Sequence, residues 1–150
     1  MSVRVVRLGS PRETDEGLRL GTVRRPPRGV PRDQYAERNH FDLWLPELAP
    51  SADLLSWAHA KPLNDKRWPV FARRYLSQMR QPSTRRLIAL LAALSLRQNF
   101  SVGCYCNDET RCHRTLLKEL LQAAGRPWRR DEEAEPLPAA RCASRLCSGV

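Results

Sequence analysis

The feature that most constrains the fold is a helix-length apolar run followed closely by a short strand. Residues 87–94 are Leu, Ile and Ala without interruption, so a helix over this segment is apolar nearly all round. Such a helix is expected to be buried on more than one side. Residues 100–106 then have the pattern of a strand. A buried helix that leads into a strand predicts a layered α/β structure with parallel strand pairing.

Other segments supply the remaining elements. Residues 3–8 alternate apolar and charged side chains, as a half-buried strand does, and residues 18–23 form a second extended segment. Asp65 is expected to cap a helix, and Gly125 to end one. The sequence predicts helices over residues 53–60, 66–80, 82–98 and 112–124.

Together these elements predict one compact α/β domain over residues 1–125, with a small, mostly parallel sheet flanked by helices. Residues 126–150 are rich in Pro and charge and have no apolar period, so we expect a flexible tail. No apolar run approaches the roughly 18–20 residues that cross a bilayer. The first residues also lack the pattern of a secretory signal. A cytoplasmic location is therefore expected.

Charge is unevenly distributed along the chain. The 150 residues carry 26 Lys and Arg against 16 Asp and Glu, for a net charge of +10. Between residues 61 and 100 Asp65 is the only acidic residue, beside nine basic ones: Lys61, Lys66, Arg67, Arg73, Arg74, Arg80, Arg85, Arg86 and Arg97. This Arg-rich segment keeps open an alternative function as a nucleic-acid-binding module. The aromatic residues at helical spacing within it favour a core stripe over a base-stacking surface.

A second basic segment is the loop of residues 24–31. It contains three Pro and a Gly, which exclude regular structure, and its arginines sit among these stiff residues. An ordinary surface loop and an anion-contacting loop explain it equally well. Arg28 is our candidate anion ligand from this loop.

The chemically informative stretch runs from residue 102 to residue 117. Strand alternation places Cys104 and Cys106 on one face, and helical spacing places Cys112 and His113 at the first turn of the next helix, in line with its core stripe. Three thiols and an imidazole should therefore meet where a strand ends and a helix begins, the edge at which α/β sheets bind ligands.

The start of that helix has consequences for charge. Free N–H groups at a helix N-terminus favour anions and lower the pKa of a thiol, so Cys112 is expected to be more thiolate-like and His113 to be held neutral. Arg111 and Arg114 add planar donors suited to phosphate or carboxylate. The candidate catalytic residues are thus Cys112 and His113, and the candidate ligand-binding residues are Arg28, Arg111 and Arg114.

Alternatives stay open for the same residues. Zinc could be held by Cys104, Cys106, Cys112 and His113, whose types are right but whose spacing is unusual for a structural site. In a second alternative, Cys106 and Arg111, which are five residues apart, imitate a sulfur- or phosphoryl-transfer loop, although this loop lacks glycine. In the simplest alternative, the cysteines have no chemical role and are small buried hydrophobic residues in a reducing compartment. Apart from this zinc alternative, no cofactor is predicted.

The chain also resembles a known family over roughly residues 3–124. The resemblance depends on segments found in order: Val3–Leu8, Pro27-Arg28-Gly29-Val30, Asp42-Leu43-Trp44-Leu45, Leu48-Ala49-Pro50-Ser51, Trp57, Trp68, Phe71, Tyr75, Cys112-His113-Arg114 and Leu116-Leu117. These are similar to the YeaO-like proteins, a family known as domain of unknown function 488. The resemblance implies a compact bacterial α/β domain and no established reaction.

Two departures from the family pattern matter. Many relatives have Asp-Arg-Leu-Trp-Pro where this chain has residues 23–27, and some lack the Cys-His-Arg triplet of residues 112–114. The resemblance therefore implies that the triplet belongs to a subgroup. From the residues and the resemblance together we expect a protein that binds a small anionic or nucleotide-like ligand between the 24–31 loop and the helix at residue 112, with zinc stabilisation as a further alternative.

Overall fold

A four-stranded, all-parallel sheet and four α-helices form the fold in a computed structural model that describes residues 3–125. The strand order is β1-β4-β2-β3, so the last strand in the chain lies between the first two. The strands are β1 (Val3–Arg7), β2 (Leu18–Gly21), β3 (Leu43–Trp44) and β4 (Phe100–Cys104). The α-helices are α1 (Ala52–Ala60), α2 (Arg67–Met79), α3 (Pro82–Ser95) and α4 (His113–Ala124). Two short 3-10 helices cover Arg32–Gln34 and Pro46–Leu48.

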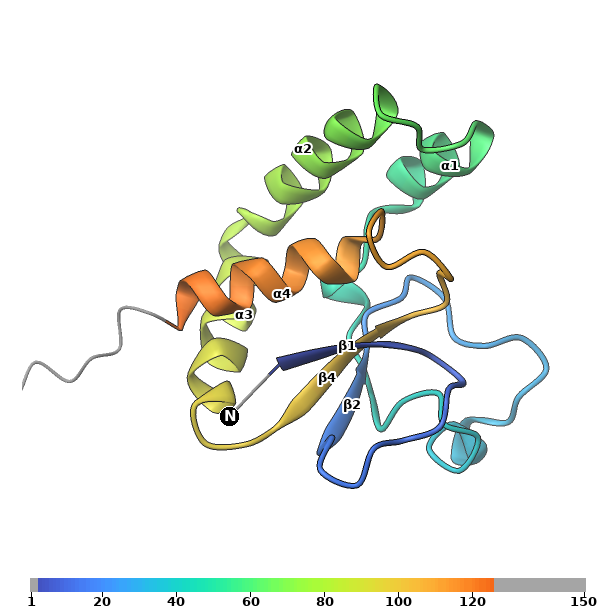
Figure 1. Cartoon of the computed structure of the whole chain (residues 1–150), viewed down its shortest axis with the longest axis vertical. Helices are drawn as coiled ribbons and strands as arrows, with labels where there is room; N and C mark the ends of the chain where they lie inside the picture. Colours follow the sequence, from blue (N-terminus) through green and yellow to red (C-terminus); the bar gives the residue numbers. More distant parts are fainter. Residues whose placement is uncertain (1–2, 126–150) are drawn as a thin grey trace, which may run out of the picture.

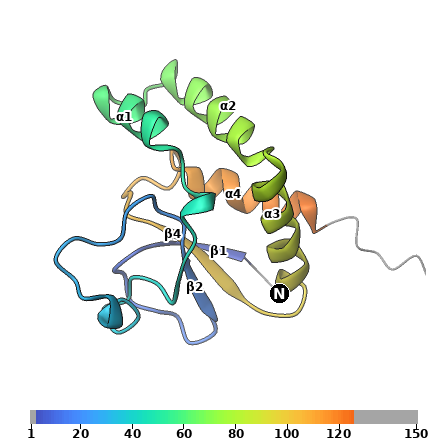
Figure 2. The ribbon, with the colours of Figure 1, turned by 180° about the vertical axis from the view of Figure 1, so that it is seen from behind.

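The sheet has a different cover on each face. Leu20 and Val102 join the main core, into which all four helices send buried side chains. Figures 1 and 2 show these helices gathered to one side of the sheet. The opposite face carries Arg19 and Ser101, both fully buried, and the loops before β2 and β3 cover it. The predicted α/β class with parallel pairing is thus confirmed.

Arg19 is the polar centre of that loop-covered face. Its guanidinium forms a bidentate ion pair with the carboxylate of Glu16, with hydrogen bonds of 2.6 and 2.8 Å. It also donates to the carbonyls of Ser10, Pro11 and Asn39. Glu16 in turn accepts from Ser101 on β4. A buried arginine is tolerable only when its donors are paired in this way. The pair ties both loops to the central strands.

Gly21, at the end of β2, allows the ring of Phe41 to approach the backbone closely on the loop-covered face of the sheet. A Cβ there would lie 2.3 Å from the ring of Phe41, far inside van der Waals contact. Phe41 packs in a small second core with Leu8, Cys104 and Cys112. The missing side chain therefore lets this second core form directly beside the sheet edge where the cysteines lie.

Two local predictions were wrong. Asn64, not Asp65, precedes α2 as the capping side chain, because its Oδ1 accepts from the backbone N–H groups of Lys66 and Arg67. Helix α3 is buried on one side only: Leu90 and Leu94 are 57 and 42 % exposed. A helix this apolar was expected to be covered more fully.

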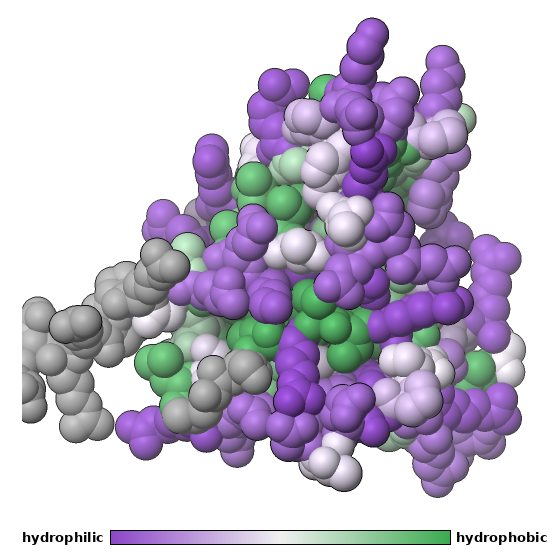
Figure 3. Space-filling view, in the orientation of Figure 1, coloured by the Kyte–Doolittle hydropathy of each residue, from purple (hydrophilic) through white to green (hydrophobic). Residues whose placement is uncertain are grey.

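The aromatic stripe of α2 is core, as its spacing predicted. Phe71 and Tyr75 are buried, and the Tyr75 hydroxyl donates to the carbonyl of Leu48. The face shown in Figure 3 is mostly hydrophilic, with small apolar areas between charged side chains. Within residues 3–125 no helix is long and apolar enough to span a bilayer. The expected tail, residues 126–150, lies outside the described residues.

Candidate functional site

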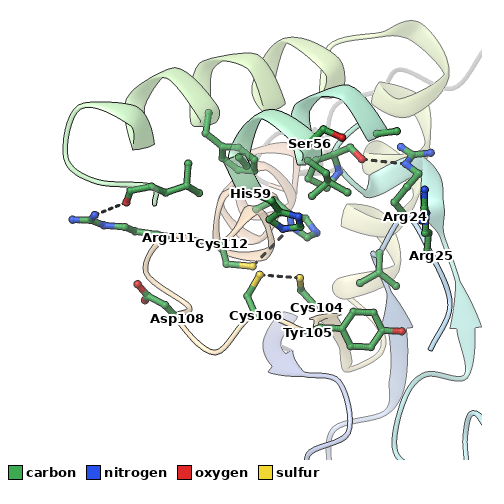
Figure 4. Close-up of a pocket in the computed structure, with 18 of the residues that line it drawn as sticks. Arg24, Arg25, Ser56, His59, Cys104, Tyr105, Cys106, Asp108, Arg111 and Cys112 are labelled. Carbon is green, nitrogen blue, oxygen red and sulfur yellow. Dashed lines mark hydrogen bonds between the residues drawn. The ribbon is translucent and has the colours of Figure 1, made fainter. Parts of the chain in front are cut away.

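A cavity of about 810 Å³ opens at the carboxyl ends of β2 and β4. Its walls come from the loop after β2, from one face of α1, and from residues 104–113 (Figure 4). This is the edge at which open parallel sheets bind ligands, because loops of different strands diverge there. Chain segments distant in sequence thus share one hollow, which the 24–31 loop and the start of α4 both border.

Three cysteine sulfurs gather at this cavity. Cys104 is the last residue of β4, Cys106 follows in the loop, and Cys112 is the residue before α4. Their Sγ atoms all lie within 4.8 Å of one another, and those of Cys104 and Cys106 are 3.4 Å apart. Cys104 and Cys112 are buried, whereas Cys106 is exposed. Among the residues described, all three thiols are free of disulfides.

The loop between β4 and α4 brings the third thiol back to the first two. Asp108 accepts hydrogen bonds from the backbone N–H and the hydroxyl of Thr110, at 2.9 and 2.6 Å. Thr115, in the first turn of α4, donates to the carbonyl of Glu109. These bonds close the loop tightly without glycine, since an aspartate side chain can replace a backbone turn.

The lowered thiol pKa falls on Cys106, not on Cys112. Hydrogen bonds from Cys104 and Cys112 to the Cys106 sulfur, with the positive charge of Arg114, hold the pKa of Cys106 far below its ordinary value. Those same contacts raise the pKa of Cys112, because its proton is shared towards its neighbours and burial disfavours its charge. The expectation that the helix start activates Cys112 is thereby corrected.

His113 is buried and neutral. Burial lowers its pKa to about 4, and its Nε2 lies 2.7 Å from the carbonyl oxygen of Thr22. A carbonyl can only accept, so Nε2 carries the proton and Nδ1 presents its lone pair. That Nδ1 lies 3.8 Å from the Cys112 sulfur. His113 therefore positions Cys112, and the lowering of its pKa by burial favours the neutral form that the sequence predicted.

The predicted arginine ligands separate into two groups. Arg28 lines the cavity, together with Arg24 and Arg25 of the same loop. Arg111 also borders it, but its guanidinium is bonded to Asp65 and to the carbonyl of Leu63, and Figure 4 shows it extending away from the thiols.

Arg114 is not at the cavity. Its side chain is 2 % exposed and donates to the carbonyl oxygens of Val6, at 2.6 Å, and Cys104, at 3.5 Å. The predicted role of Arg114 as an anion contact is therefore wrong, because its guanidinium lies inside the protein. It joins the ends of β1 and β4.

Sequence reasoning missed the contribution of α1. Ala52, Leu55, Ser56 and His59 line the cavity, and their spacing of three, four and seven residues places them on one helix face. Ser56 and His59 are both exposed. Ser56 and His59 are the polar residues among the apolar residues 54–60, and they were the available signal for this wall.

Among the three cysteines of the cluster, Cys106 should be the first to react with iodoacetamide at neutral pH in protein kept free of metal with a chelator. It is the exposed member of the cluster, and its lowered pKa supplies the thiolate that reacts. Mass-spectrometric mapping of partly alkylated protein measures the order. Cys106→Ser should remove the fast phase. Faster labelling of Cys112 than of Cys106 would contradict this assignment.

Comparisons with known proteins place the chain among relatives without assigned activity. Uncharacterized proteins of Mycobacterium bovis and of two Mycobacterium tuberculosis strains are each 28 % identical over 119 residues, which cover 79 % of this chain and 92 % of theirs. No solved structure matches the chain. A family model described as the active DUF488-N3 subclade matches residues 3–125. The chain therefore belongs to the DUF488 family, in that subclade, as the resemblance in its sequence indicated.

Proposed function

We propose that this protein binds a small anionic, nucleotide-like ligand in the cavity at the carboxyl ends of β2 and β4. The observation that carries the proposal is the composition of the walls: a loop with three arginines on one side and apolar helix surface on another. Ligand cavities in proteins span about 300–1,000 Å³, and this one, at about 810 Å³, has room for a nucleotide.

The basic wall supports an anion. Arg25 and Arg28 are exposed at the cavity, so their guanidinium groups can reach a ligand without breaking into the core. Arg24 is held by the carbonyls of Ala49 and Pro50, at 3.2 and 3.1 Å, which fixes the beginning of the loop. Planar guanidinium donors suit phosphate oxygens, because two parallel hydrogen bonds can form.

The apolar wall supports a flat or hydrophobic portion of the same ligand. Leu55 from α1, Leu63 from the loop after it, and Phe71 from α2 also line the cavity. A base can pack against such surface while its phosphate meets the loop. Asp108 is also at the rim, and its negative charge favours a ligand that carries its anionic group at the arginine end.

Binding of adenosine 5′-monophosphate, measured by titration calorimetry at low salt, tests the proposal. We expect binding that weakens with added salt, and weaker binding of adenosine or inorganic phosphate alone. Arg25→Ala and Arg28→Ala should each weaken binding about 10- to 100-fold, since a hydrogen bond to a charged group contributes about 1.5–3 kcal/mol.

The matched control is Arg86→Ala. Arg86 is exposed on α3 and is not part of the cavity, so its replacement removes the same charge without touching the site. The affinity of Arg86→Ala for adenosine 5′-monophosphate should equal that of the unaltered protein. No binding of either the nucleotide or inorganic phosphate, or equal losses in Arg28→Ala and Arg86→Ala, would overturn the proposal.

A further inference from the structure

We propose that Cys104, Cys106 and Cys112 bind one zinc ion through their sulfurs, with the fourth coordination position open towards the cavity. Among the described residues, these three cysteines form a cluster of potential metal ligands. Their sulfurs all lie within 4.8 Å of one another. All three cysteines line the cavity. The proposal concerns the metal alone and does not depend on the proposed nucleotide ligand.

The spacing of the sulfurs matches a shared metal. With zinc–sulfur distances of about 2.3 Å, the edges of a tetrahedral site are about 3.8 Å long. The sulfurs of Cys104 and Cys106 are 3.4 Å apart, and no two of the three sulfurs are more than 4.8 Å apart, so the cluster is close to that size. Movements of well under 1 Å per sulfur are then enough to complete three corners of the tetrahedron.

Two of the three ligands are held in place by the fold. The carbonyl of Cys104 accepts from the backbone N–H of Leu8, at 2.9 Å, which fixes the end of β4 against the chain after β1. Cys112 is buried directly before α4, whose first turn Arg114 anchors to that same strand end. Only Cys106, in the exposed loop, has freedom to close on a metal, and a site with two fixed ligands loses little entropy on binding.

His113 does not complete the set. Its Nε2 is taken by the carbonyl of Thr22, and its Nδ1 faces the sulfur of Cys112. Three protein ligands with a fourth position left open are the arrangement of catalytic rather than structural zinc sites. The wider set that included His113 is thus narrowed to the three sulfurs.

A buried cation beside the cluster favours the negative charge that such a site carries. Three thiolates and one Zn²⁺ leave a net charge of −1. The Arg114 guanidinium is buried 3.5 Å from the Cys104 carbonyl, and among the described residues it forms no ion pair with a carboxylate. The Nε of Arg114 is a buried donor that has no hydrogen-bond partner among the described residues. A zinc–thiolate cluster next to it supplies the missing counter-charge.

Metal titration of the full chain, without a polyhistidine tag, tests the proposal. Cys142 and Cys147 are replaced by Ser throughout, so that thiolate signals come from the cluster alone. We expect one zinc per chain after dialysis, by elemental analysis. With Co²⁺ in its place we expect a thiolate charge-transfer absorption and the visible bands of a tetrahedral ion.

Cys106→Ser is the decisive variant, because Cys106 is exposed and its replacement leaves the core intact. It should lose stoichiometric zinc and the tetrahedral Co²⁺ bands while its circular dichroism stays unchanged. Zinc should also protect Cys106 from iodoacetamide in the unaltered cluster. Arg28→Ala should bind zinc normally, which separates this result from nucleotide binding. Failure to retain zinc, or full retention by Cys106→Ser, would overturn the proposal.

Discussion

Replacing Glu16 with Ala should lower the free energy of unfolding by about 3–5 kcal/mol, because it leaves a buried arginine without its counter-charge. Glu16 and Arg19 are 1 and 0 % exposed, and their two hydrogen bonds join the loop before β2 to that strand. Chemical unfolding followed by circular dichroism measures the change. Since small domains have only about 5–15 kcal/mol of stability in total, the variant should be close to unfolding.

The control is an ion pair of the same length on the surface. Asp15 pairs with Arg4 at 2.7 Å, but its side chain is 62 % exposed. Such a pair is screened by water, so Asp15→Ala should change the stability by less than about 1 kcal/mol. Equal losses in the two variants would show that burial of the Glu16–Arg19 pair contributes nothing.

The same pair predicts how stability changes with acid. Burial alone would raise the pKa of Glu16, but hydrogen bonds from Arg19 and Ser101 outweigh it and lower the pKa from 4.5 to about 2. Because the folded protein binds this proton less readily than the unfolded chain, the stabilisation is complete above pH 4.5 and is lost as the pH falls towards 2. Glu16→Gln should flatten the stability profile over that interval.

Periodic patterns were sufficient to predict the framework of the fold. The alternation of residues 3–8 and the apolar segment that begins at Phe100 predicted β1 and β4, and the stripe through Leu117 and Leu121 predicted α4. These patterns report burial, and burial in a parallel sheet follows directly from side-chain period. The meeting of the thiols at the end of β4 followed from the same geometry.

Properties set by contacts across the fold were not predictable. Arg19 occupies the charged position of an alternating segment, which normally faces solvent, yet loops from elsewhere in the chain bury it. Which of the three thiols carries the lowest pKa depends on hydrogen bonds among sulfurs that no spacing rule specifies. Leu90 is likewise exposed although it lies in an apolar run, because no other element of the described residues covers it. Local sequence gives the elements, whereas these outcomes depend on their partners.

Arg114 and Arg111 illustrate that limit and offer the second large effect. Both were expected to contact an anion, but Arg114 is buried with two backbone carbonyls as partners, and Arg111 lies at the rim beside the exposed Asp65. The two arginines are three residues apart in the sequence, one just before α4 and one in its first turn, so their sequence context is nearly the same. The structure therefore predicts opposite consequences for the same substitution.

Arg114→Ala should destabilise the protein by about 3–5 kcal/mol, since it removes a large buried side chain together with its hydrogen bond to the carbonyl oxygen of Val6. Arg111→Ala, the matched control, should cost less than about 1 kcal/mol, because the side chain of Asp65 is 91 % exposed. Thermal and chemical unfolding of the two variants decide between a structural and a ligand-binding role. Arg114→Met restores much of the volume but no donor, so it should recover only part of the loss. If Arg114→Ala were as stable as Arg111→Ala, the arginine would not hold β1 and β4 together at the edge where the three cysteines meet.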